Sequence, residues 1–135
     1  ESRRVEQQAD ELVIWLKYVA DSAIFDGVVY GIDLTPESLQ VYGLSRGQWG
    51  QALAIEAFLV AAPFTIDFQS EQEISAIDTI VESDKEDAPV LPELVLMPGG
   101  TIEPNGSFIV TAEQQSPLSV YWNDDGVLES RIVND

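Results

Sequence analysis

Residues 2–27, SRRVEQQADELVIWLKYVADSAIFDG, decide the fold, because apolar side chains recur along them in steps of three and four. The stripe consists of Val5, Ala9, Leu12, Leu16, Val19 and Ala23. It is widened by Val13, Trp15, Ala20 and Ile24. The spacing predicts a long helix from Ser2 to about Phe25, partly buried on more than one side, that Gly27 ends. No convincing N-cap residue precedes it, so we expect the helix to continue upstream of Glu1.

After Gly27 the pattern changes to short apolar runs separated by turn residues, which predicts strands. The expected strands are 28–34, 39–44, one beginning at Trp49, 64–68, 94–97, 108–112, 118–122 and 127–133. Hairpin turns are expected at 35–38 and 123–126. We interpret 69–93 as a variable loop that contains the exposed acidic run 82–87. The sequence therefore predicts an α+β protein with one domain, 1–135, in which a helix (1–26) precedes a β body (27–135).

Charge and composition exclude several classes of function. The chain has 135 residues and a mass of 14.8 kDa, and its 24 Asp and Glu against 6 Lys and Arg leave a net charge of −18. Such a chain repels phosphate backbones and anionic lipids, so we expect no nucleic-acid partner. It has no His and no Cys, which removes imidazole bases, thiol nucleophiles, disulfides and the zinc sites built on those ligands. We find no membrane-spanning run, and because Glu1 is not Met we expect an upstream segment to have been removed.

Two motifs invite a chemical interpretation, and each has a simpler one. The acidic run 82–87 offers oxygen ligands for calcium, but it lacks the spacing of a calcium loop and contains Lys85. Gly99-Gly100 is followed by neither a Lys-Ser/Thr pair nor a helix, so it indicates a turn and not a phosphate loop. No motif singles out a carboxylate pair for glycoside hydrolysis. We therefore expect no enzyme activity, no catalytic residue, no metal and no cofactor.

The aromatic residues allow two interpretations. Trp15, Trp49 and Trp122, with Tyr30, Tyr42 and Tyr121, have the composition of a sugar-stacking platform on a β-sandwich. Tyr121 and Trp122 are neighbours on an expected strand, however, so their side chains point to opposite faces. We favour packing in the core or between subunits over sugar binding.

Four stretches, in this order, resemble the H-type minor pseudopilins of the type II secretion system, which are type IV pilin-like proteins. Residues 9–27 resemble the helix end and its exit at Gly27, and 28–48 followed by Trp49 resemble the first hairpin. Residues 94–104, LVLMPGGTIEP, resemble an apolar strand followed by a Pro-x-Gly-Thr-x-x-Pro segment that contains Pro98, Gly100 and Pro104. Residues 108–133 resemble the closing strands. Asn105 stands where the family pattern has an aromatic residue.

The resemblance implies a pilin-like fold, with the long helix packed on two antiparallel sheets in a sandwich-like arrangement. It implies a methylated, non-enzymatic subunit near the tip of the pseudopilus in a Gram-negative bacterium, periplasmic and anchored in the inner membrane by a single N-terminal helix. The implied partners are the major pseudopilin and the other minor pseudopilins. Within the helix we expect Val5, Ala9 and Leu12 to contact a neighbouring subunit, with local core packing as the alternative. Leu16, Val19 and Ala23 should pack on the chain's own sheet.

Two other functions compete with this interpretation. Minor pilins of type IV pili resemble the chain equally in fold, and some bind DNA through a basic C-terminal region. In 121–135, however, acidic residues outnumber the single Arg131, which favours secretion over DNA uptake. A carbohydrate-binding β-sandwich is the second alternative, although such a module does not need the long first helix.

Overall fold

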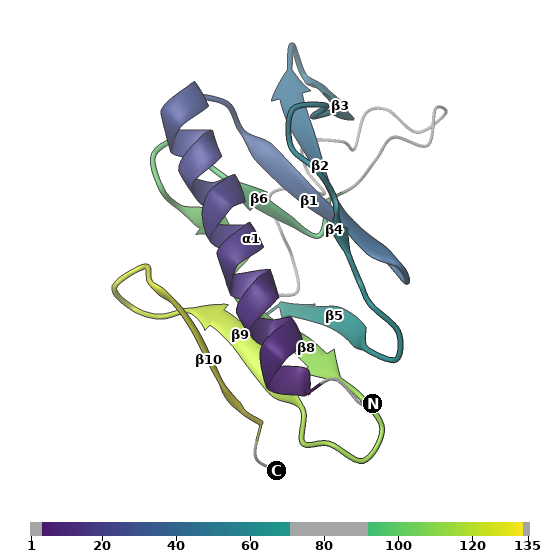
Figure 1. Ribbon diagram of the computed structural model, residues 1–135. Coiled ribbons are helices and arrows are strands. Elements are labelled where there is room, and N and C mark those ends of the chain that lie inside the picture. The colour runs from purple at the N-terminus through teal and green to yellow at the C-terminus, as the bar shows by residue number, and fades with distance from the viewer. Residues whose placement is uncertain (1–3, 71–91, 134–135) are drawn as a thin grey trace.

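The computed structural model describes residues 4–70 and 92–133, and in it one helix lies across two antiparallel sheets (Figure 1). The helix α1 spans Val5–Asp26. The strands in the described residues are β1 (Tyr30–Thr35), β2 (Ser38–Ser45), β3 (Gln48–Gln51), β4 (Phe58–Leu59), β5 (Thr65–Ser70), β6 (Leu94–Leu96), β7 (Ile102–Glu103), β8 (Gly106–Thr111), β9 (Leu118–Trp122) and β10 (Leu128–Ile132). The expected α+β architecture, a long helix packed on two antiparallel sheets, is confirmed.

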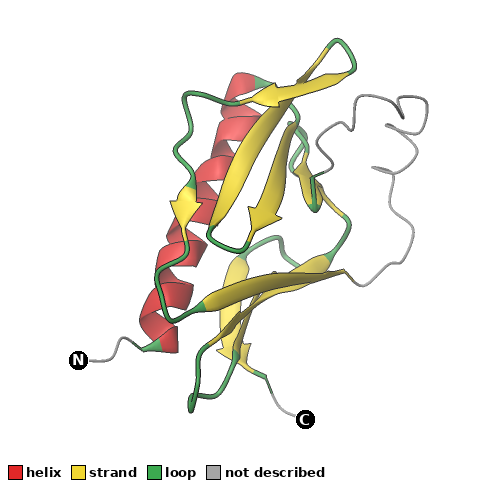
Figure 2. Ribbon diagram, turned by 90° about the vertical axis from the view of Figure 1, so that its right-hand side faces the viewer, coloured by secondary structure: helices red, strands yellow, loops and turns green. Residues whose placement is uncertain are grey.

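The strands form a larger and a smaller sheet, which Figure 2 shows from the side. The larger sheet has the order β3-β2-β1-β6-β7, with β4 also paired to β2. The smaller sheet has the order β10-β9-β8-β5. Chain neighbours β1 and β2 form a hairpin that closes at the Thr35–Ser38 pair, and β9 and β10 form the hairpin expected around 123–126. In Figure 1 the helix begins beside the smaller sheet and ends beside the larger one.

The helix ends where the sequence predicts. Gly27 has a φ of 67°, and its N–H donates to the carbonyl of Ala23 over 3.0 Å. This left-handed conformation favours glycine, because glycine has no Cβ atom that would clash with the backbone. At the other end Arg4 is the N-cap residue, and its side chain makes no capping hydrogen bond. The backbone N–H of Val5 instead donates to the side-chain oxygen of Gln115 over 2.8 Å, which ties the first turn to the loop before β9.

A single apolar core joins the helix to both sheets. Its fully buried side chains come from α1, from the centre of the larger sheet and from β8 and β9 of the smaller one, and the largest of them are Phe108, Leu12, Leu16, Ile32, Leu39, Leu94 and Leu96. Phe108 packs against Phe68 and Trp122, with ring centroids 4.9 and 6.5 Å apart. The two sheets and the helix therefore form one structural unit across the described residues.

The predicted strands agree with the structure except at their ends and in two short elements. The sequence prediction missed β4 and β7, because two-residue strands carry no periodicity that can be recognised. Residues Gln69 and Ser70 belong to β5, so the expected loop 69–93 begins too early. The rest of that loop up to residue 91, with the acidic run 82–87, lies outside the described residues.

Candidate assembly interface

The inward face of α1 contains all six residues of the predicted stripe. Leu16, Val19 and Ala23 are 0% exposed and belong to the chain's own core. Val5, Ala9 and Leu12 are 1%, 0% and 0% exposed and belong to the same core. The structure thus corrects the expected contact of these three residues with a neighbouring subunit. Because the smaller sheet covers the first half of the helix, they present no surface to a neighbour.

A different set of apolar residues lies on the outward face of α1. Ile14, Tyr18 and Phe25 are 70%, 54% and 91% exposed. At about 100° per residue they fall within about 40° of one another, directly opposite the buried stripe. We refer to these three residues as the outward ridge. Sequence analysis overlooked the ridge, although a helical wheel drawn from the stripe would have shown three large apolar residues on its far side.

The segment of residues 52–63, which contains β4, lies along one side of the helix. The indole N–H of Trp15 donates to the carbonyl of Glu56 over 2.8 Å, and its ring lies 5.7 Å from that of Phe58. The side-chain oxygen of Gln8, which is 2% exposed, accepts the N–H of Ala61 over 3.2 Å. These contacts hold the loop on the edge of α1 that contains Trp15.

Exposed apolar side chains also occur on the segment 52–63. Leu53 and Leu59 are 87% and 72% exposed, and Ala54 and Ala57 are exposed as well. We define the helix–loop surface as the outward ridge of Ile14, Tyr18 and Phe25 together with Leu53 and Leu59.

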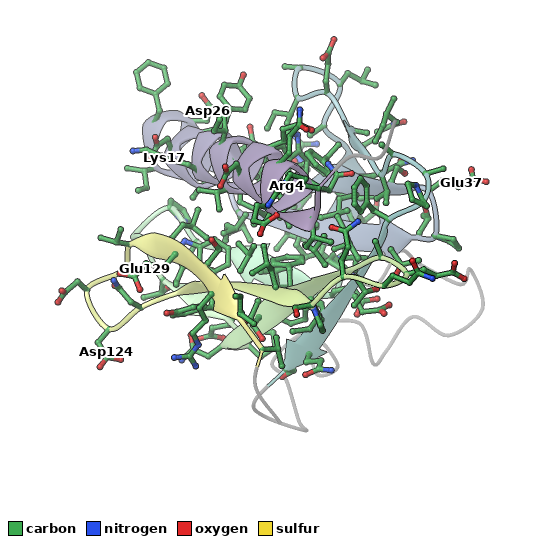
Figure 3. All side chains as sticks on the ribbon, turned by 60° about the horizontal axis from the view of Figure 1, so that its bottom comes forward. Arg4, Lys17, Asp26, Glu37, Asp124 and Glu129 are labelled. Atoms are coloured by element: carbon green, nitrogen blue, oxygen red, sulfur yellow. The ribbon has the colours of Figure 1, made fainter. Side chains whose placement is uncertain are left out.

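The opposite edge of α1 is acidic. Glu6, Asp10 and Asp21 are exposed there, with Lys17 between the two aspartates. Figure 3 shows Lys17 near the far end of the helix and Arg4 at its first turn. The Arg4 guanidinium lies 3.4 Å from the Glu6 carboxylate, and both side chains are largely exposed. Acidic side chains also lie on the edge that contains Trp15, where Asp26 and Glu56 are exposed.

The aromatic residues do not gather into one platform. Trp15 packs on Phe58, Trp122 packs on Phe108, and Trp49 lies in β3 close to Gly31. Tyr121 lines a groove of about 790 Å³ on the smaller sheet, but the Arg131 guanidinium covers its ring at 4.9 Å. A hydrogen bond from the Tyr121 hydroxyl to Glu129 raises the Tyr121 pKa. Other side chains thus pack against the rings of Trp15, Trp122 and Tyr121.

Two carboxylates, Asp33 on β1 and Glu93 just before β6, have raised pKa values. Loss of solvation raises the pKa of Asp33, and loss of solvation together with the charge of Asp33 raises that of Glu93. Residues 4–70 and 92–133 contain no group of three or more potential metal ligands of the His, Cys, Asp and Glu type.

The residues of the family-like motif mark chain reversals and one strand. Gly27 ends α1, and Trp49 lies in β3. Pro98 and Gly100 lie in the turn between β6 and β7, where Gly100 has a φ of 99° and donates to the carbonyl of Met97. Pro104 follows β7 and is preceded by a cis peptide bond. Gly100 and Pro104 also line the groove that contains Tyr121.

Comparison with known proteins gives the fold. No protein-family model and no curated protein matches the sequence. A structure of the minor pseudopilin EpsH from the type 2 secretion system of Vibrio cholerae aligns with a TM-score of 0.68 and 13% identity, covering 98% of this chain and 100% of that chain. A crystal structure of EpsH from the same system aligns with a TM-score of 0.66 and 15% identity, covering 94% and 92%.

Within the described part of the chain no helix combines the length and the apolar composition needed to cross a membrane. At 13–15% identity the likeness extends to the fold, over nearly the full length of both chains. The chain has the pilin-like fold of the minor pseudopilins of type II secretion.

Proposed function

We propose that the chain is a non-enzymatic structural subunit of the type II secretion pseudopilus, a minor pseudopilin that acts near the tip. In this role it supports the export of folded proteins across the outer membrane through protein–protein contacts. The likeness to EpsH supports the proposal because it covers both chains almost completely, including the long first helix.

The observation that carries the proposal is that α1 is apolar on two opposite faces. The inward stripe is covered by the chain's own sheets, whereas Ile14, Tyr18 and Phe25 are exposed. Fully burying one large apolar side chain is worth roughly 1.5–3 kcal/mol. A subunit that packs its helix against neighbours in a filament gains this stabilisation on the outward ridge. A protein that acts alone leaves the ridge in water.

The location and partners follow from the same proposal. The subunit is anchored in the inner membrane of a Gram-negative bacterium by an N-terminal apolar helix, with residues 1–135 in the periplasm and with methylation during its maturation. Its partners are the major pseudopilin and the other minor pseudopilins. The net charge of −18 keeps the domain soluble and limits association between identical copies.

The test is complementation of a strain in which the gene has been deleted. The complete gene product, either unchanged or with Ile14→Asp, is expressed at equal levels, and the proteins that the strain exports are assayed in the medium and in the periplasm. We expect deletion to trap them in the periplasm, the unchanged gene to restore export, and Ile14→Asp to restore less than a tenth of it. Val127→Asp is the matched control, because Val127 is 55% exposed in the β9–β10 turn, outside the helix–loop surface.

Three outcomes contradict the proposal. If export continues without the gene, the chain is not a subunit of the secretion system. If deletion instead removes surface fibres and leaves export unchanged, the chain is a minor pilin of a type IV pilus. An Ile14→Asp chain that is folded and fully active would leave the proposal without its carrying observation.

A further inference from the structure

The last strand of the smaller sheet has an open edge. Within the described residues β10 pairs with β9 alone, and Figure 1 shows it at the outer border of this sheet. Its residues 129–132 are exposed. The strand pairs with β9 in unbroken register and contains neither a proline nor a bulge, which are two of the devices that natural proteins use to block such an edge. A further strand can therefore pair with it.

The direction of each backbone group follows from hydrogen bonds at the two ends of β10. The N–H of Asn123 donates to the carbonyl of Val127 over 2.8 Å, and the N–H of Val133 donates to the carbonyl of Pro117 over 2.9 Å. In an antiparallel pair, every second residue exchanges hydrogen bonds with the partner strand. The odd-numbered residues from 127 to 133 therefore face β9. The N–H and carbonyl groups of residues 128, 130 and 132 face the open edge.

The side chains of β10 alternate between an apolar face and a charged face. Leu128 packs against the core, and Ile132, which is 53% exposed on the same face, lines a groove of about 470 Å³ beside the first turn of α1. On the other face Glu129 accepts a hydrogen bond from the Tyr121 hydroxyl over 3.0 Å. The Arg131 guanidinium lies 4.9 Å from the centroid of the same ring. Tyr121 thus holds an acidic and a basic side chain two residues apart beside the open edge.

These features define a complementary strand. We propose that the open edge of β10 binds an extended segment of another protein chain, which runs antiparallel to β10 and has the pattern apolar, acidic, any residue, basic, apolar. The acidic residue lies opposite Arg131 and the basic residue lies opposite Glu129. The apolar residues lie opposite Ile132 and Leu128. This surface is separate from the outward face of α1, so the inference goes beyond the proposed function.

The backbone and the side chains have different tasks in such a complex. The outward backbone groups of residues 128, 130 and 132 supply affinity through main-chain hydrogen bonds, and the alternating side chains supply specificity. Glu129 and Arg131 form the pairs without direct hydrogen bonds between the strands, in which opposite side chains approach most closely. Exchanging the two charges of the segment would place like charges opposite each other, which is destabilising.

A second copy of this chain has the required pattern but is a poor partner. Its residues 128–132, Leu-Glu-Ser-Arg-Ile, have the same order. Pairing of two such edges, however, brings net charges of −18 together, and repulsion opposes this association. A two-fold axis through the paired edges would also reverse the direction of α1, whereas subunits anchored in one membrane keep their helices in the same direction. This last argument, unlike the rest of the inference, rests on the proposed function.

The test uses two peptides of identical composition and net charge, both with blocked ends. One has the sequence of residues 127–133, and in the other the glutamate and the arginine are exchanged. Each peptide is titrated into the 135-residue chain labelled with nitrogen-15, and the backbone amide shifts give the dissociation constant. We expect the first peptide to bind at least about fivefold more tightly, with the largest shifts along β10. Glu129→Arg/Arg131→Glu should reverse the preference.

A proline variant shows whether the backbone edge itself is the binding site. Ser130→Pro removes the central outward N–H and no hydrogen bond to β9, so the chain should stay folded and bind neither peptide. Ser130→Ala keeps the N–H and should bind both peptides as the original chain does. Lys17→Asp/Asp67→Lys exchanges an exposed base and an exposed acid on α1 and β5, and should leave the preference unaltered. If the proline variant does not fold, the charge-exchange variant at 129 and 131 decides the question.

Four results overturn the inference. The first peptide binds no more tightly than the second, the preference is unchanged in Glu129→Arg/Arg131→Glu, or folded Ser130→Pro retains binding. The fourth result is sedimentation of the chain as a dimer that Ser130→Pro dissociates, because the edge would then belong to a second copy. The complementation assay separates these failures from failure of the proposed function, since it measures export in the absence of any peptide.

Discussion

The two faces of α1 have similar apolar residues and opposite environments. On the inward face Leu12 and Leu16 are 0% exposed, whereas on the outward face Ile14 and Phe25 are 70% and 91% exposed. The chain's own sheets account for the first face completely. Nothing in the described part of the chain covers the second. The difference teaches that the apolar pattern of one helix can encode two functions, folding on one side and assembly on the other.

The strongest test of the difference between the two faces of α1 is to place the same charge on each of them. Leu12→Asp buries an unpaired carboxylate in the core, and we expect it to cost more than about 4 kcal/mol of unfolding free energy. That is a large part of the stability of a domain of this size. Ile14→Asp should change the free energy of unfolding by less than about 0.5 kcal/mol, because the side chain is already in water.

Urea denaturation followed by circular dichroism measures both variants. A cooperatively folded Leu12→Asp domain with near-normal stability would show that the inward assignment of Leu12 is wrong. The original expectation that Leu12 contacts a neighbour would then be restored.

The attachment of the loop to the helix gives the next largest effect. Gln8→Ala removes the acceptor of the Ala61 N–H and the donor to Glu11, 3.2 Å away in each case. We expect a loss of about 1–3 kcal/mol, because the part-buried N–H of Ala61 loses its partner. Gln7→Ala, at the exposed neighbouring position, should cost little. Hydrogen exchange of the Ala61 amide reports the local effect, and unchanged protection would rule out this role of Gln8.

A substitution at the C-terminal end of α1 should have a smaller effect on stability. Gly27→Ala forces a side chain into a left-handed conformation with a φ of 67°, although no atom lies within 4 Å of the added Cβ. The cost is therefore that of the backbone alone, about 1 kcal/mol. Gly50→Ala, also with open space around the Cβ atom, is the control. Thermal denaturation should separate the two variants, and equal melting temperatures would contradict the capping role.

The smallest effect concerns pH. The Glu93 pKa lies above its ordinary value of 4.5 in the folded chain, because of lost solvation and the nearby charge of Asp33. The folded state thus binds a proton more tightly than the unfolded state, and this contribution to stability is lost as pH rises above 4.5. Glu93→Gln should therefore be more stable than the original chain at pH 7, by about 0.5 kcal/mol or less since solvent screens the charge.

The difference between Glu93→Gln and the original chain should vanish well below pH 4.5, where both side chains are neutral. Urea denaturation at several pH values measures it. A difference that grows as the pH falls would have the wrong sign for this account.

The helix and most strands could be predicted because their signals are local. The stripe from Val5 to Ala23, the stop at Gly27 and the hairpin at 35–38 each depend on residues close together in the chain. The assignment of Val5, Ala9 and Leu12 to a neighbour was wrong for a tertiary reason. The pattern shows that a face is apolar, but the fold decides whether the smaller sheet or another subunit covers it.

The helix–loop surface depends on contacts between distant residues and could be predicted only in part. Ile14, Tyr18 and Phe25 are recognisable as one helical face from their spacing alone. The position of the segment with Leu53 and Leu59 beside α1 depends on the hydrogen bond from Trp15 to Glu56, which joins residues 41 positions apart. No local pattern indicates such a contact, so this part of the candidate site required the structure.

The most direct test of the account is a site-specific cross-link on the outward ridge. Residues 1–135 contain no cysteine, so Ile14→Cys gives this part of the gene product a single thiol, which a short thiol–amine reagent can join to amines on a neighbour in intact cells. We expect a cross-linked product containing a different pseudopilin, and none from Asp67→Cys, which is exposed on β5. Equal cross-linking from both positions, or none from Ile14→Cys in cells that export normally, would contradict the claim that this face mediates assembly.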